Sequence, residues 1–121
     1  MQLVLIVDDS PTELHVMQTA LQRHGYRTAA ASDGAEGVRL ARAMSPDLIF
    51  MDVVMPGMNG YQATRALVND PKTRSIPIVM VTSKGQETDK IWGLRQGAVD
   101  YMVKPVTPDQ LVAKAQATLA A

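Results

Sequence analysis

The sequence predicts an α/β fold in which a doubly wound, five-stranded parallel sheet is covered by five helices. Two observations support this prediction. Five short apolar runs alternate along the chain with longer amphipathic stretches, and several of the runs are continuous in Val, Ile and Leu. Continuous apolar runs are typical of parallel strands that are covered on both faces. Right-handed crossovers between such strands place the intervening helices on both sides of the sheet.

The five strands are expected at the five apolar runs. These runs are Leu3–Val7, Tyr26–Ala31, Asp47–Met51, Ile76–Val81 and Val99–Val103. The second run is the weakest, because it contains an arginine, a threonine and three alanines. In doubly wound sheets, ligands bind at the carboxyl ends of the strands. Functional side chains are therefore expected directly after these runs.

The first helix has clear start and stop signals. Ser10 has the form of an N-cap, Pro11 follows at the first helical position, and Glu13 stands where a capping box places its glutamate. Gly25 is the stop signal. One face of this helix is apolar, through Leu14, Met17 and Leu21. A helix is predicted between Ser10 and Gly25.

The start and stop signals of the other helices are less uniform. Asp33, Asn59 and Thr107 each precede a Glu or Gln by three residues, which is the capping-box spacing. The last helix repeats apolar residues at intervals of four, at Leu111, Ala115 and Leu119. A fourth helix is expected near Gln86–Gln96, where the apolar face is least regular and the start is poorly marked.

Composition bounds the class of protein. A chain of 121 residues suits one domain, 1–121. Twelve basic and twelve acidic residues cancel, whereas a nucleic-acid or anionic-membrane binder usually has a basic excess. Cysteine is absent, which excludes disulfides and Cys-based zinc sites. The N-terminal apolar run is too short for a signal peptide or a membrane span. We expect a cytoplasmic domain without nucleic-acid binding or membrane insertion.

Charged and polar side chains follow the predicted strands. Asp8 and Asp9 come after the first run, Asp52 after the third, Thr82 after the fourth and Lys104 after the fifth. Three carboxylates at one edge raise each other's pKa unless a cation neutralises them. Oxygen-only ligands favour a hard ion, Mg²⁺ or Mn²⁺. A lysine and a hydroxyl at the same edge suit the oxygens of a transferred phosphoryl group.

Each of these residues also has an ordinary interpretation. Asp9 alone is a possible helix cap, Asp8 and Asp52 are possible solvated loop acids, Thr82 a common strand residue and Lys104 a common surface lysine. All of these ordinary interpretations would have to hold together, at the one edge where the fold places a site. A phosphoryl site is the simpler explanation.

Four segments carry a resemblance to a known family. They are Ile6–Ser10, Met51–Gly60, Val81–Ser83 and Asp100–Pro105. In order and spacing the sequence resembles the receiver domains of two-component response regulators, especially the single-domain, chemotaxis-type ones. The resemblance implies a flavodoxin-like sheet with strand order 2-1-3-4-5. The stretch Gln86–Ala98 is similar to regulators of pilus-based twitching chemosensory systems.

The resemblance implies a role for each acidic residue. Asp52 would accept a phosphoryl group from a histidine kinase, a histidine phosphotransfer domain or a small acyl phosphate. Asp9, Asp52 and the backbone carbonyl of Val54 would hold Mg²⁺, with Mn²⁺ as a substitute. Asp8 would act mainly through bound water. The protein would be a signalling phospho-acceptor rather than an enzyme.

It also implies how the signal is formed and passed on. Lys104 would bind a phosphoryl oxygen, and its bond to Pro105 would be cis. Thr82 would donate its hydroxyl to the phosphoryl group, and Tyr101 would rotate inward from solvent as Thr82 moves. A monomer would then contact a downstream protein through the face made by the fourth helix, the fifth strand and the fifth helix.

One position departs from the flagellar relatives. They carry Asn two residues past the acceptor, where it orients the hydrolytic water, and this chain has Val54 there. Two residues past Thr82 stands Lys84. Metal binding is not affected, because a backbone carbonyl serves. Self-dephosphorylation is expected to be slow.

Three other functions fit the sequence less well. A phosphohydrolase of the haloacid-dehalogenase type needs a second Asp two residues past the nucleophile, and Val54 stands there. A flavodoxin-like cofactor binder needs a phosphate loop after the first strand, where Asp8 and Asp9 would repel an anion. A DNA-binding regulator needs an effector domain, and the chain ends at the last predicted helix. Output through a protein partner is expected.

Overall fold

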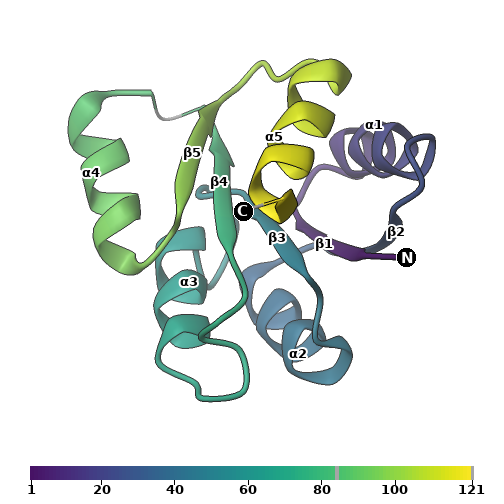
Figure 1. Ribbon diagram of the computed structural model, residues 1–121. Coiled ribbons are helices and arrows are strands. Elements are labelled where there is room, and N and C mark those ends of the chain that lie inside the picture. The colour runs from purple at the N-terminus through teal and green to yellow at the C-terminus, as the bar shows by residue number, and fades with distance from the viewer. Residues whose placement is uncertain (84, 121) are drawn as a thin grey trace.

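The computed structural model describes residues 1–83 and 85–120 and has the predicted α/β architecture (Figure 1). Strands and helices alternate along the chain without exception among the described residues. In order they are β1 (Leu3–Val7), α1 (Pro11–Gln22), β2 (Arg27–Ala31), α2 (Gly34–Met44), β3 (Leu48–Met51), α3 (Gly60–Val68), β4 (Ile78–Thr82), α4 (Glu87–Gln96), β5 (Asp100–Val103) and α5 (Pro108–Ala120). None of these helices has the length and hydropathy that crossing a membrane would require.

The sheet is parallel throughout, and its order is β2-β1-β3-β4-β5, as the resemblance implied. Each strand begins within two residues of its predicted first residue. The fourth strand begins later than predicted, at Ile78, because Pro77 has no N–H for the ladder. It also ends later, so that Thr82 belongs to the strand itself.

Two layers of helices cover the sheet, and alternate strand residues point into each layer. Val4 and Ile6 of β1 pack with buried residues of α1 and α5, including Leu21 and Leu111. Leu5 and Val7 face the other side. There they pack against α2 and α3, through Ala41, Ala63 and Leu67. This alternation explains why the β1 run is apolar at every position.

The helix caps match the sequence signals with two exceptions, at α1 and α2. At α2 the Asp33 side chain accepts from the Glu36 N–H, but the Glu36 carboxylate accepts from the Ser32 N–H instead of from Asp33. Asn59 and Gln62 form a complete capping box at α3. Thr107 and Gln110 exchange the same two bonds at α5. At α1 the Ser10 hydroxyl accepts from the Glu13 N–H at 3.3 Å, but the Glu13 carboxylate does not return to Ser10. The predicted capping box at Ser10 is therefore wrong in its second half.

Helix α4 stands apart at one edge of the molecule, beside β5 (Figure 1). Its N-cap Gln86 makes no side-chain cap bond. Gly93 and Gln96 are its buried residues, whereas the Trp92 side chain is 46% exposed. Helix α4 approaches the sheet through a glycine and not through Trp92, because a Cβ on Gly93 would lie 2.7 Å from the Met80 sulfur.

Candidate functional site

The structure brings together the three carboxylates predicted to share one edge. Oxygen atoms of Asp8, Asp9 and Asp52 all lie within 4.8 Å of one another. The backbone places them there, because the Asp8 N–H donates to Ala31 at 3.0 Å and the Asp52 N–H donates to Val7 at 2.9 Å. Both bonds continue the parallel ladders past the strand ends. Asp8 and Asp52 are buried, whereas Asp9 is exposed at the mouth of the cluster.

This donor set fits a hard divalent cation. Three carboxylates supply oxygen ligands only, and an open side leaves room for the several waters that Mg²⁺ keeps. Asp9, Asp52 and Asp8 are the residues that could hold such an ion. The Val54 side chain is 54% exposed beside them, and the role of its carbonyl as a ligand stays a prediction.

Lys104 reaches into the cluster from the loop after β5. Its Nζ lies 3.0 Å from Asp8 Oδ2 and 3.4 Å from Asp52 Oδ2. A third carboxylate, Glu13 Oε2, lies at 2.5 Å. The bond from Lys104 to Pro105 is cis, as predicted. The ammonium therefore neutralises part of the cluster's negative charge.

Glu13 is a site residue that the sequence reasoning missed. Its spacing from Ser10 is that of a capping box, and this explained the residue without a functional role. Its position in the first turn of the helix that follows Asp8 and Asp9, however, indicated a functional role. A long acidic side chain on that first turn can fold back over the carboxyl edge of the sheet.

The pKa values of these groups reflect burial and pairing. Burial raises the pKa of Asp8 to about 6, against the hydrogen bonds from Ser10 and Lys104. Burial also raises the pKa of Asp52, and Lys104 opposes this. The hydrogen bond from Lys104 lowers the pKa of Glu13. Burial alone would lower the pKa of Lys104, but the bonds to Glu13 and Asp8 raise it instead.

The loop that begins with Asp52 after β3 is held close to helix α3. A Cβ on Gly60 would lie 2.0 Å from the Asp52 carbonyl oxygen, so only glycine fits there. The Gly60 N–H donates to Val53 at 2.9 Å. The Asp52 carboxylate itself accepts from the Val53 N–H through Oδ1 at 2.8 Å, which leaves Oδ2 facing Lys104.

Thr82 ends β4, and Tyr101 is the second residue of the neighbouring strand β5, where it pairs with Met80. Thr82 is fully buried, and its carbonyl accepts from the Lys104 N–H at 2.8 Å. The Tyr101 ring is half-buried and packs against the cluster that contains Met80, and its inward rotation from solvent stays a prediction. The Tyr101 phenol is also hydrogen-bonded to Tyr61, and burial raises its pKa. Lys84 lies outside the described residues.

The fold and this edge define a receiver. The model of the response regulator receiver domain matches residues 4–116, and the chain belongs to that family. Membership implies a histidine kinase as input and a downstream partner as output.

Among curated proteins, the chain is 52% identical to Protein PilH of Pseudomonas aeruginosa over 97% of each chain. It is 39% identical to the DNA-binding response regulator MtrA of Mycolicibacterium smegmatis, of which it spans 50%.

Solved structures agree with this assignment. Chemotaxis protein CheY4 of Vibrio cholerae superimposes with a TM-score of 0.92 at 33% identity, covering 97% of this chain and 98% of that one. The receiver domain of the sensor histidine kinase PA1611 from Pseudomonas aeruginosa gives a TM-score of 0.91 at 32% identity, over 99% and 98% of the two chains. That structure has a magnesium ion coordinated in its active-site cleft.

Proposed function

We propose that this protein is a phospho-acceptor response regulator in which Asp52 receives the phosphoryl group. The proposal rests on the surroundings of the Asp52 carboxylate. It is buried beside Asp8 and Asp9, one oxygen is held by the Val53 N–H, and the other faces Lys104. A carboxylate with one fixed and one available oxygen is arranged as an oriented nucleophile.

In the proposed step, Asp52 Oδ2 attacks the phosphorus of a phosphohistidine or a small acyl phosphate. An O–P bond forms, the P–N or P–O bond to the donor breaks, and the bonding pair leaves with the donor. Asp9, Asp52 and the Val54 carbonyl would hold Mg²⁺, with Asp8 acting through water. The bound cation supplies charge neutralisation for the phosphoryl oxygens.

Lys104 and Thr82 would receive the phosphoryl oxygens that face away from the cation. Lys104 already lies 3.4 Å from the acceptor oxygen, and a charged donor there stabilises the added negative charge. Thr82 ends β4 at the same edge and has a hydroxyl to donate. Movement of Thr82 toward the phosphoryl group would change the packing around the Tyr101 ring.

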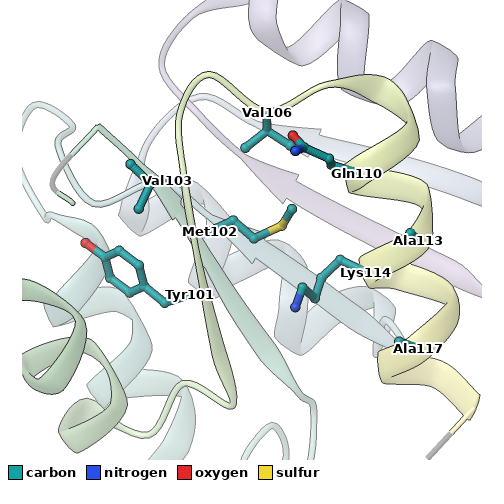
Figure 2. A pocket seen from close by; sticks show the side chains of 8 residues that line it. All are labelled: Tyr101, Met102, Val103, Val106, Gln110, Ala113, Lys114 and Ala117. Carbon is teal, nitrogen blue, oxygen red and sulfur yellow. The ribbon is translucent and has the colours of Figure 1, made fainter. Parts of the chain in front are cut away.

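The output surface is proposed to be the face of α4, β5 and α5. An open groove of about 410 Å³ lies between β5 and α5 on this face, and Figure 2 shows Met102 and Lys114 pointing into it. Tyr101 lies at the edge of this groove on the side away from α5 (Figure 2). A change at Tyr101 would thus reach both α4 and the groove.

The pathway is proposed from similarity. The 52% identity to Protein PilH, together with the Gln86–Ala98 stretch, favours a chemosensory system that controls pilus-driven twitching. In this proposal the protein is a cytoplasmic, monomeric receiver of one domain, 1–121. It does not turn over a substrate beyond its own phosphoryl group.

Intact-mass spectrometry with acetyl phosphate and Mg²⁺ tests the proposal. The wild-type protein should gain one phosphoryl group, and Asp52→Asn should gain none. Asp109→Asn is a matched control, because it removes one carboxylate from the exposed first turn of α5. Full labelling of Asp52→Asn would overturn the assignment of the acceptor.

A further inference from the structure

Glu13 is the charged group at this edge that the proposed reaction does not use. We infer that Glu13 is a positioning residue: it holds the Lys104 ammonium on the α1 side of the pocket and so leaves the aspartates available to the divalent cation. This inference rests on the proposed function, because it concerns the same cation and the same lysine.

The distances show that three carboxylates share the Lys104 ammonium and that the ammonium is biased toward Glu13. Lys104 Nζ contacts Glu13 at 2.5 Å, Asp8 at 3.0 Å and Asp52 at 3.4 Å. An ammonium has three hydrogens to donate, and here three carboxylates compete for them. The shortest contact is to Glu13, which is not one of the three clustered aspartates, so Glu13 draws the charge away from Asp52.

This bias matters because the ammonium and a divalent cation compete for the same oxygens. A cation that binds Asp52 directly and Asp8 through water would take over the part of their charge that Lys104 now neutralises. The Lys104 side chain is only 18% exposed, so water replaces the lost partners poorly. Glu13 keeps one anionic partner for Lys104 outside the cation's ligand set.

The position of Glu13 is fixed by local structure. Ser10 caps the Glu13 N–H, and the Leu14 N–H donates to the Ser10 carbonyl at 3.0 Å, so the first turn of α1 is anchored. The side chain lines a hollow of about 170 Å³ between α1 and the loop after β5, together with Lys104 and Pro105. The contact therefore joins two elements that are 91 residues apart in sequence.

Magnesium titration of the metal-free protein by isothermal calorimetry, without a phosphoryl donor, tests the inference. Glu13→Gln should raise the Mg²⁺ dissociation constant by about three- to tenfold, the effect of losing one charge-assisted contact. Asp109→Asn removes an equal charge from an exposed helix start and should change it by less than about twofold. Thermal melts of every variant establish that each is folded.

A double-mutant cycle separates positioning from simple charge. In a Lys104→Met background the ammonium is gone, so Glu13→Gln should lose most of its effect on the dissociation constant. An equal effect in both backgrounds, or no effect in the wild-type background, would overturn the inference. A wild-type protein that binds no Mg²⁺ would instead contradict the proposed function itself.

Discussion

The acidic edge and helix α4 lie on the same domain and are built in opposite ways. At the edge, Asp8 and Thr82 are buried and their backbones continue the strand ladders. On α4, large apolar side chains such as Ile91 and Trp92 are exposed, and the helix starts without a side-chain cap. The residues proposed for chemistry therefore lie at the rigid centre of the sheet. The proposed output lies where packing is light enough to adjust.

The largest expected effect comes from removing the exposed carboxylate of the edge. Asp9→Ala leaves Asp8 and Asp52 with Lys104 as their cation, so Mg²⁺ affinity should fall by at least about tenfold. Labelling by acetyl phosphate should be lost. The metal-free melting midpoint should not fall, because the Asp9 charge raises the pKa of Asp52 and its removal relieves repulsion. Labelling of Asp9→Ala at the wild-type rate would contradict the proposed role of the acidic edge in the chemistry.

The contrast between the acidic edge and α4 also explains which features could be predicted from the sequence alone. The strands and the acidic edge follow from continuous apolar runs that end in charged residues, whereas the strand order was implied by the resemblance to receiver domains. Glu13 was missed because one side chain had two possible partners, and only tertiary distance decides between Ser10 and Lys104. The exposure of Trp92 could not be predicted from the sequence, because α4 packs through Gly93 and an apolar side chain does not reveal which face of a weakly amphipathic helix is covered.

A second expected effect is an unusual pH dependence of the metal-free protein. The folded-state pKa of Asp8 is raised to about 6, above its ordinary value of 3.8. A folded state that binds the proton more tightly gains stability as pH falls through about 6. The free energy of unfolding should therefore rise by about 1 kcal/mol between pH 8 and pH 5.

Saturating Mg²⁺ should remove this rise, because the cation stabilises the ionised carboxylate. Urea melts at a series of pH values, with and without Mg²⁺, measure both effects. Stability that falls steadily from pH 8 to pH 5 without metal would show that Asp8 is not the dominant titrating group. In that case the ionised carboxylates of the acidic edge would destabilise the metal-free protein no more than the exposed charges of α4 do.

The smallest expected effect concerns Val54, which is exposed beside the proposed acceptor. An apolar side chain cannot hydrogen-bond the water that hydrolyses an aspartyl phosphate. Val54→Asn should shorten the phosphoryl lifetime by roughly two- to tenfold, the effect of one added hydrogen bond. The lifetime is measured as loss of the phosphorylated mass after the donor is removed. An unchanged lifetime would indicate that another group controls the water.

Trp92 emission tests the link between the two regions most directly, because this tryptophan is the sole one in the chain and lies on α4. Adding beryllofluoride and Mg²⁺, which imitate the phosphoryl group, should change the emission of the wild-type protein. Asp52→Asn should give no change, and Thr82→Ala should give a much reduced one although its Asp52 remains. A full response in Thr82→Ala, or none in the wild type, would contradict the proposed route from Asp52 to α4.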